Sequence, residues 1–240
     1  MDVIGVIPAR YGSTRFEGKV LADIYGKPMI QWVWEAAKKA KILDEVIVAC
    51  DDKRIEEAVK SFGGKSVFTS KEHTCGADRI CEVVNPLEVK VVVNIQADEP
   101  LLDPVMIENV ARPLLDNPAL NMATLMKRID EHREITDPNV VKVLTDKNGL
   151  ALYFSRSPIP YSQDKSVRAV YYKHIGLYAY TKDFLFIFKN LPESYLEKME
   201  KLEQLRVLEA GFKIKVIETK VSTIGVDTPE DLEKVKKTIS

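Results

Sequence analysis

A basic segment with two glycines follows the first apolar run of the chain. Between Pro8 and Lys19 the sequence gathers Arg10, Arg15 and Lys19 around Gly12 and Gly18. Guanidinium and ammonium groups can neutralise several phosphate charges, and glycine lets a backbone approach a ligand closely. The segment, which includes Ala9 and Ser13, therefore predicts a polyphosphate site. A solvated loop whose glycines only form turns is the alternative.

Two familiar nucleotide motifs are excluded in this segment. Residues 12–19 have the GxxxxGK spacing, but Val20 stands where a Walker A loop needs Ser or Thr to hold a metal. The pattern also predicts no helix starting there. A GxGxxG motif is absent as well, so a dinucleotide-dependent oxidoreductase has no support.

Two carboxylates are candidates for holding a metal. Asp98 follows the most apolar strand-like run, and Asp227 precedes a helix start at Thr228-Pro229. Mg²⁺ commonly binds one or two carboxylates together with substrate phosphates. Two plainer roles stay open: Asp98 could cap a helix or pair with an arginine, and Asp227 could favour the positive end of a helix dipole.

Alternating strand and helix patterns must position these groups. Strands are predicted at 3–7, 46–49, 66–68 and 89–95, and helices at 30–40, 54–62, 78–84 and 104–115, the last with Asp103 as N-cap. This alternation predicts an α/β, doubly wound, mostly parallel Rossmann-like sheet. In such sheets ligands bind at the carboxyl ends of the strands, where the basic segment and Asp98 both lie.

The pattern changes after Met122. Strands at 140–144, 150–154 and 175–180 predict a smaller antiparallel excursion, approximately residues 128–190, that could act as a lid or a dimer interface. Helices are predicted at 184–191, at 196–210 with Gly211 ending the helix, and at 229–239, and a strand at 214–217. We expect residues 1–240 to form one domain, because no linker or repeat divides them.

Composition narrows the class of protein. The chain has 240 residues, a net charge of −1, 45% hydrophobic and 30% charged residues, which is typical of a soluble globular protein. The balanced charge argues against nucleic acid as a partner. Three cysteines without metal-site spacing indicate reduced thiols, and no signal peptide or membrane span is expected, so we predict a cytoplasmic protein.

Several motifs in the same order resemble one enzyme family, CMP-KDO synthetase, also called 3-deoxy-manno-octulosonate cytidylyltransferase. They occur at residues 7–15 (IPARYGSTR), 96–100 (QADEP), 153–160 (YFSRSPIP), 173–180 (KHIGLYAY), 202–206 (LEQLR) and 226–231 (VDTPED). The resemblance covers nearly the whole chain. It implies a Mg²⁺-dependent nucleotidyltransferase that transfers CMP from CTP to the anomeric 2-hydroxyl of KDO for lipopolysaccharide synthesis, releasing pyrophosphate, and that forms a homodimer.

The resemblance also implies roles for particular residues. Lys19, Asp98 and Asp227 would be catalytic, with Asp98 and Asp227 as metal ligands. The nucleotide side would comprise Ala9, Arg10, Ser13, Arg15, Lys19 and Arg79. The sugar pocket would comprise Gln96, Arg156, His174, Tyr178, Glu203 and Gln204. Arg156 suits the carboxylate of an acidic sugar through bidentate pairing, whereas a His or Tyr on a strand, or a polar pair on a helix, is often only structural.

Three positions depart from the family pattern. Cys75 and Ala77 stand where the family usually has Ser and Thr, and Ala97 where it has Gly. The lost hydroxyls put nucleotide contacts there in doubt.

Two other functions stay open at this point: a CMP-sialic acid synthetase or another acidic-sugar cytidylyltransferase, and a non-catalytic nucleotide-binding protein on the same fold.

Overall fold

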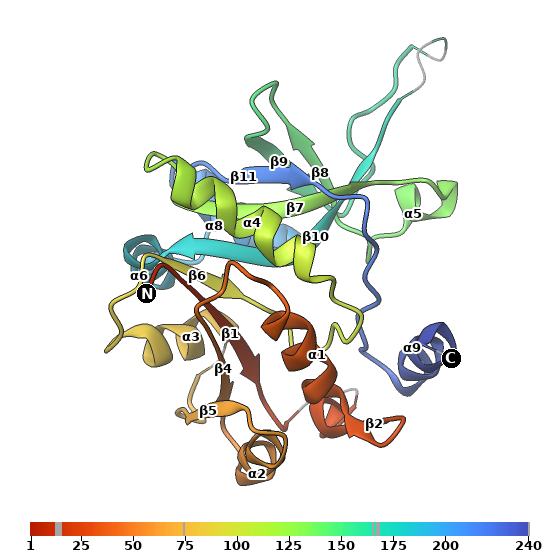
Figure 1. The fold of residues 1–240 in the computed structure, drawn as a ribbon. Helices are drawn as coiled ribbons and strands as arrows, with labels where there is room; N and C mark the ends of the chain where they lie inside the picture. The colour runs from red at the N-terminus through yellow and green to blue at the C-terminus, as the bar shows by residue number, and fades with distance from the viewer. Residues whose placement is uncertain (13–15, 74, 165, 167–168, 240) are drawn as a thin grey trace.

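One mixed sheet organises the computed structural model, which describes residues 1–12, 16–73, 75–164, 166 and 169–239. Within those residues nine strands join in one sheet, with the path β11-β7-β10-β6-β1-β4-β5 and with β8 and β9 attached through β10 (Figure 1). The strands are β1 (Val3–Ala9), β4 (Glu45–Cys50), β5 (Lys65–Phe68), β6 (Val91–Asn94), β7 (Met122–Arg128), β8 (Lys142–Thr145), β9 (Ala151–Ser155), β10 (Tyr172–Thr181) and β11 (Lys215–Glu218). A separate hairpin is formed by β2 (Asp23–Ile24) and β3 (Lys27–Pro28).

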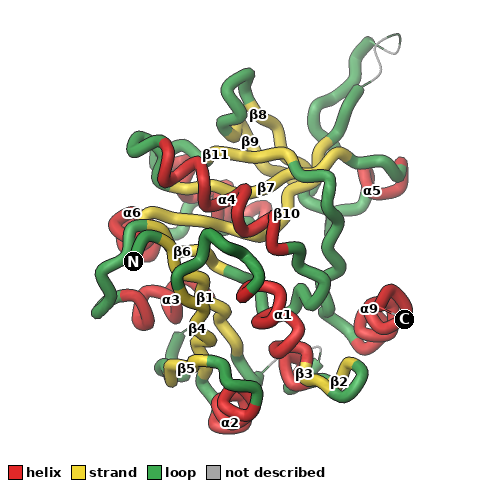
Figure 2. Tube along the Cα trace, in the orientation of Figure 1, coloured by secondary structure: helices red, strands yellow, loops and turns green. Residues whose placement is uncertain are grey.

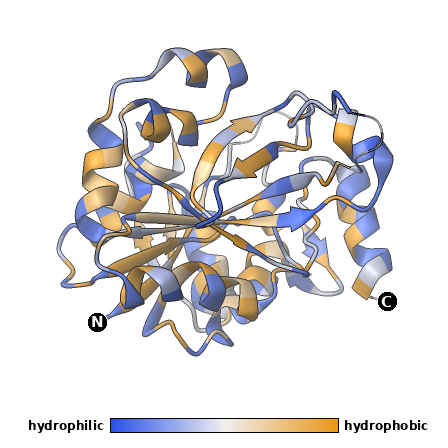
Figure 3. Cartoon of the chain, turned by 90° about the horizontal axis from the view of Figure 1, so that it is seen from above, coloured by the Kyte–Doolittle hydropathy of each residue, from blue (hydrophilic) through white to orange (hydrophobic). Residues whose placement is uncertain are grey.

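Helices cover both faces of the sheet, as Figures 2 and 3 show. They are α1 (Met29–Lys38), α2 (Lys53–Ser61), α3 (Gly76–Val84), α4 (Pro104–Asp116), α5 (His132–Thr136), α6 (Lys182–Asn190), α7 (Tyr195–Glu200), α8 (Gln204–Glu209) and α9 (Pro229–Ile239). The predicted cap of α4 is confirmed, because the side chain of Asp103 accepts a hydrogen bond from the Val105 N–H at 2.8 Å. The predicted α/β doubly wound class is confirmed too.

Strand β1 shows why both faces must be covered. Its Val3 and Ile7 pack in the core shared with α1, α2 and α4, whereas Ile4 and Val6 pack in the core shared with α3 and α6. All four side chains are fully buried. A strand buried on both faces reads as a continuous apolar run, which is the pattern seen in its sequence.

The predicted antiparallel excursion is confirmed, and it is continuous with the main sheet. Strand β10 pairs antiparallel with β6, β7 and β8, and β8 pairs antiparallel with β9. Strand β7 was not predicted as a strand, although its first four residues are buried. The parallel half, β6-β1-β4-β5, matches the sequence prediction.

The last helix packs against the start of the chain. In a small apolar cluster, Val226, Leu232 and Val235 meet Ile24 and Met29. The segment that leads into α9 is thereby held near residues from the start of the chain.

The helices of the described ranges are too short or too polar to cross a membrane.

Candidate active site

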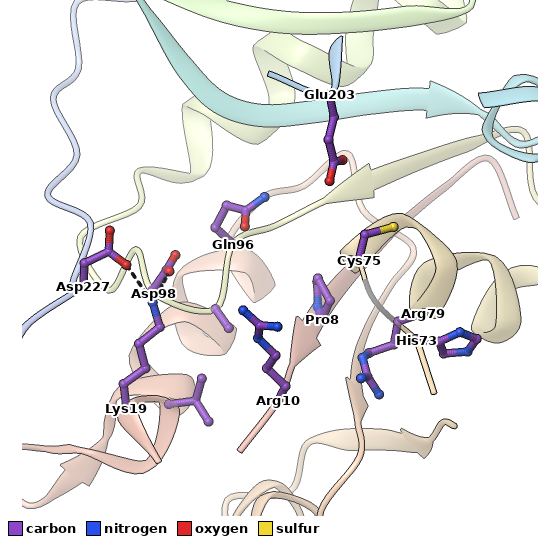
Figure 4. Close-up of a pocket in the computed structure, with 13 residues that line it drawn as sticks. Pro8, Arg10, Lys19, His73, Cys75, Arg79, Gln96, Asp98, Glu203 and Asp227 are labelled. Carbon is purple, nitrogen blue, oxygen red and sulfur yellow. Dashed lines mark hydrogen bonds and ion pairs between the residues drawn. The ribbon is translucent and has the colours of Figure 1, made fainter. Parts of the chain in front are cut away.

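The carboxyl ends of β1 and β6 form the floor of a cavity. These strands are parallel neighbours, with Val6 opposite Asn94, so Arg10 after β1 and Asp98 after β6 emerge at the same edge. The cavity has a volume of about 340 Å³. Figure 4 shows the side chains that line it. Its lining includes Arg10, Lys19, His73, Cys75, Arg79, Gln96, Asp98, Glu203 and Asp227. The predicted meeting of the basic segment with Asp98 is confirmed.

Lys19 lies between the two predicted metal ligands. Its Nζ donates to Asp98 Oδ2 at 2.6 Å, to Asp227 Oδ1 at 3.2 Å and to the backbone carbonyl of Val226 at 3.1 Å. The side chains of Lys19, Asp98 and Asp227 are 15%, 30% and 50% exposed. Two carboxylates from distant parts of the chain therefore share one cation at the cavity wall (Figure 4).

A backbone hydrogen bond brings Asp227 to this place. The N–H of Val226 donates to the carbonyl of Asp98 at 2.9 Å, and the fully buried Val226 side chain anchors the segment in the cluster beneath α9. Asp227 must then lie beside Asp98. At the start of α9, the carboxylate of Asp231 accepts hydrogen bonds from the N–H groups of Asp227 and Thr228.

Gly18 sets the position of Lys19. Its φ of +66° is in the left-handed region, and its N–H donates to the carbonyl of Tyr11 at 2.9 Å. A Cβ on Gly18 would lie 3.0 Å from the Tyr11 ring. Lys19 then begins a single 3₁₀ turn, Lys19–Leu21, not an α-helix, which agrees with the exclusion of a Walker A loop.

The two carboxylates suit a hard cation such as Mg²⁺. Carboxylate oxygens are its preferred protein ligands, and substrate phosphates and water commonly complete its octahedral shell. Asp98 and Asp227 already meet around the positive charge of Lys19. The described part of the chain gathers no group of three or more His, Cys, Asp or Glu side chains that could hold a metal alone. This donor set fits a metal that arrives with a phosphate substrate.

The nucleotide-side predictions have different outcomes in the structure. Arg10 is exposed, and its side chain extends into the cavity (Figure 4), while Ala9 is buried at the end of β1. Ser13 and Arg15 lie outside the described residues. Arg79 lines the cavity but is only 3% exposed.

The guanidinium of Arg79 is already engaged by protein groups. It donates to Asp51 Oδ2 at 2.9 Å, to the Ser70 carbonyl at 3.3 Å and to Thr69 Oγ1 at 2.5 Å. These bonds join β4, the segment after β5 and α3. A nucleotide-binding role for Arg79 remains a prediction, and its bonds give it a structural role as well.

Five of the six predicted sugar residues line a second cavity of about 320 Å³. They are Gln96, His174, Tyr178, Glu203 and Gln204. This cavity shares Pro8, Gly76, Gln96 and Glu203 with the first one, so the two adjoin. Gln96 is held at the junction, where its Nε2 donates to the Gly176 carbonyl at 3.2 Å.

Arg156 is not among the residues that line either cavity. Its guanidinium donates to the backbone carbonyls of Glu200 at 2.7 Å and Pro138 at 2.8 Å. The backbone N–H of Arg156 donates to the Glu200 carboxylate at 2.9 Å. These bonds tie the end of β9 to the end of α7. Binding of a sugar carboxylate by Arg156 stays a prediction.

His174 and Tyr178 are neutral groups of the cavity wall. Burial lowers the pKa of His174 to about 3, and burial raises the pKa of Tyr178. His174 Nε2 is hydrogen-bonded to Thr124 Oγ1 at 2.9 Å, and its ring packs edge-on to Phe154. Both side chains can exchange hydrogen bonds with hydroxyl groups at neutral pH without adding charge.

The prediction of one helix over residues 196–210 is wrong. Lys201 has φ +54°, in the left-handed region, so α7 ends at Glu200 and α8 begins at Gln204. The three-residue apolar spacing continues across the break, which is why the pattern resembles a single helix; it runs through Leu196, Met199, Leu202, Leu205 and Leu208. The break turns Glu203 and Gln204 towards the cavity (Figure 4 shows Glu203).

Sequence reasoning missed Asn94 and Lys201, both of which line the second cavity. A signal existed for Asn94, because it is the one polar residue of the buried run Val91-Val92-Val93-Asn94. Lys201 carried no comparable signal.

Comparisons with known proteins identify the family of the chain. A family model described as cytidylyltransferase matches residues 4–216. A 3-deoxy-manno-octulosonate cytidylyltransferase from Geobacter sulfurreducens is 51% identical, covering 98% of both chains, and one from Solibacter usitatus is 52% identical, covering 98% of this chain and 93% of its own. The chain belongs to the 3-deoxy-manno-octulosonate cytidylyltransferase family.

Solved structures place this family member among the cytidylyltransferases. A CMP:2-keto-3-deoxy-manno-octonic acid synthetase complexed with CTP superposes with a TM-score of 0.95 at 46% identity, covering 100% of this chain and 98% of its own. A 4-diphosphocytidyl-2C-methyl-D-erythritol synthase from Anaerococcus prevotii has a TM-score of 0.65 at 14% identity, covering 99% of this chain and 98% of its own, which shows a shared fold. The suspected family resemblance is confirmed.

The three departures from the family pattern lie at the site. Cys75 and Ala97 line the first cavity, and Ala77 lines the second. Cys75 is the N-cap residue of α3, and its side chain makes no cap hydrogen bond. This member of the 3-deoxy-manno-octulosonate cytidylyltransferase family therefore lacks the hydroxyl that could both cap α3 and reach a ligand.

Proposed function

We propose that this protein transfers CMP from CTP to the anomeric 2-hydroxyl of KDO and releases pyrophosphate. The observation that carries the proposal is the meeting of Lys19, Asp98 and Asp227 at a cavity which adjoins a second cavity lined by polar side chains that can hydrogen-bond to hydroxyl groups. The relatives named above support this sugar over sialic acid.

The residues of the chain suit an in-line displacement at the α-phosphorus, which is catalysed chiefly by positioning and charge neutralisation. Arg10 and Lys19 would neutralise the triphosphate, and Lys19 would donate to the departing pyrophosphate. In the second cavity, Gln96, Glu203 and Gln204 would orient the sugar so that its 2-hydroxyl faces the phosphorus. No covalent intermediate with the protein is required.

We also propose dependence on Mg²⁺, held by Asp98 and Asp227. The ion would supply positive charge to the phosphate oxygens and would lower the pKa of the attacking hydroxyl. The pairing of both carboxylates with one ammonium group supports this proposal. Lys19 would then be freed to turn towards the phosphates.

A cytoplasmic homodimer is part of the proposal. Free cysteines and a nucleotide substrate favour the cytoplasm. A dimer through the antiparallel region is supported by large exposed side chains there, since Leu152 is 62% and Tyr161 is 80% exposed.

The test is a pyrophosphate-release assay with CTP and Mg²⁺. We expect release with KDO and none with N-acetylneuraminic acid. Release with neither sugar would favour a non-catalytic nucleotide-binding protein, and release with N-acetylneuraminic acid alone would favour a sialic acid synthetase.

Variants of the two carboxylates test the metal proposal. Asp98→Asn and Asp227→Asn should each lower turnover roughly 100-fold or more, the scale expected when electrostatic stabilisation is removed. The matched control is Asp116→Asn, because Asp116 is exposed at the end of α4 and lines neither cavity. Wild-type turnover in either site variant would contradict the metal assignment.

A further inference from the structure

Two buried amide atoms of the second cavity lack a hydrogen-bond partner. They are Asn94 Oδ1, an acceptor, and Gln204 Nε2, a donor. The residues are 8% and 4% exposed, and both line the cavity. Buried polar groups are nearly always paired, so each unpaired atom at a cavity indicates a missing partner.

Asn94 occupies a position that favours an apolar side chain. It ends β6 after three buried valines and lies opposite Tyr178 of β10 in the antiparallel register. Its side chain therefore shares a face with Tyr178 and with Gln96, two positions further along. Asparagine is unfavourable in buried strands, so packing alone does not account for it.

Tyr180 is the other tyrosine on this face of the sheet, because it lies two residues beyond Tyr178 on β10. An amide donates through nitrogen and accepts through oxygen. Among the described residues, no group donates a hydrogen bond to Asn94 Oδ1.

We propose that Asn94 is a specificity-determining residue whose Oδ1 accepts a hydrogen bond from one hydroxyl of the acceptor sugar, beside a donor from Gln204 Nε2. A polyol satisfies both atoms, because each hydroxyl can donate and accept. This inference rests on the proposed function and adds a contact that selects against sugars lacking that hydroxyl, since they would leave a buried acceptor unpaired.

The first test is the Asn94→Ala variant in the pyrophosphate assay. We expect the KM for KDO to rise roughly tenfold, as for the loss of one hydrogen bond to a buried partner, while the KM for CTP stays within about twofold. Ser66→Ala is the matched control. Ser66 Oγ is also buried without a partner, but Ser66 lines neither cavity. The control should leave both KM values unchanged.

The second test measures the KM of KDO analogues that each lack one hydroxyl, first on the wild-type protein and then on Asn94→Ala. One analogue should show a KM roughly tenfold above that of KDO, and this penalty should disappear in Asn94→Ala. A KM close to that of KDO for every analogue on the wild-type protein would overturn the inference without any variant. An equal penalty in both proteins for every analogue, or an unchanged KM for KDO in a folded Asn94→Ala variant, would overturn it as well. The proposed function fails separately, through absence of turnover with KDO in the wild-type protein.

Discussion

Lys19 pairs with two carboxylates, and the structure predicts that the two pairs contribute unequally to the free energy of unfolding. The Nζ–Oδ2 distance to Asp98 is 2.6 Å, and the Asp98 side chain is 30% exposed, whereas the distance to Asp227 is 3.2 Å and that side chain is 50% exposed. At 2.6 Å and an effective dielectric constant of about 20, the Coulomb energy is about 6 kcal/mol, most of which desolvation offsets. A charged hydrogen bond of this kind contributes a net value of about 1.5–3 kcal/mol.

The Asp227 pair should be much weaker. At 3.2 Å with a dielectric constant near that of water, about 80, the attraction is about 1 kcal/mol before screening. Exposed pairs measure about 0.2–1 kcal/mol. The structure therefore predicts that Asp98 is the principal partner of Lys19 and that Asp227 contributes less than half as much.

Two double-mutant cycles measure this difference. They combine Lys19→Met with Asp98→Asn or with Asp227→Asn, and free energies of unfolding are obtained by urea titration in EDTA without nucleotide. The Asp98 coupling should persist in 0.5 M salt (about a 4 Å screening length), and the Asp227 coupling should fall towards zero. Equal couplings, or a larger one for Asp227, would refute the reasoning from distance and exposure.

Three further perturbations follow from the structure. Arg79→Met should lower the free energy of unfolding by about 3 kcal/mol, because it removes the cation that pairs with the largely buried carboxylate of Asp51. A decrease below about 1 kcal/mol in urea unfolding would contradict this prediction. His174 has a folded pKa of about 3 against about 6.5 when unfolded, so the unfolded chain alone gains a proton as pH falls below 6.5. Its contribution to stability should fall by about 2 kcal/mol between pH 7 and pH 5, and this fall should be missing from His174→Gln in parallel urea titrations. Gly18→Ala should cost about 1–2 kcal/mol through its positive φ, with further loss from contact with Tyr11, and should lower turnover by displacing the lysine that follows; unchanged melting and turnover would show that the loop tolerates a side chain.

Local patterns predicted the parallel half of the sheet well. The runs that became β1, β4 and β6 are buried on both faces, so their apolar sequence is continuous and hard to mistake. The rule that ligands bind at the carboxyl ends of such strands then placed the basic segment and Asp98 together.

The failures lie where long-range contacts override local pattern. Residues 196–210 keep an apolar residue at every third position from Leu196 to Leu208, across the backbone reversal at Lys201, and periodicity carries no information about that single φ angle. The structural role of Arg79 was not predicted either, because no local pattern indicates that Asp51, 28 positions earlier in the sequence, accepts a hydrogen bond from its guanidinium.

By itself the sequence determined the α/β class, the family and the residue types of the site, because periodicity and motif order are local properties of the chain. Only the tertiary structure decided how Asp227 comes to lie beside Asp98 and which buried polar atoms face the second cavity. Asp227 reaches Asp98 because the Val226 N–H bonds to the Asp98 carbonyl and α9 packs on Ile24 and Met29. The role proposed for Asn94 also depends on the tertiary structure. The sequence shows only a polar residue after three valines, whereas the structure shows that Asn94 lines a cavity and that its Oδ1 has no partner.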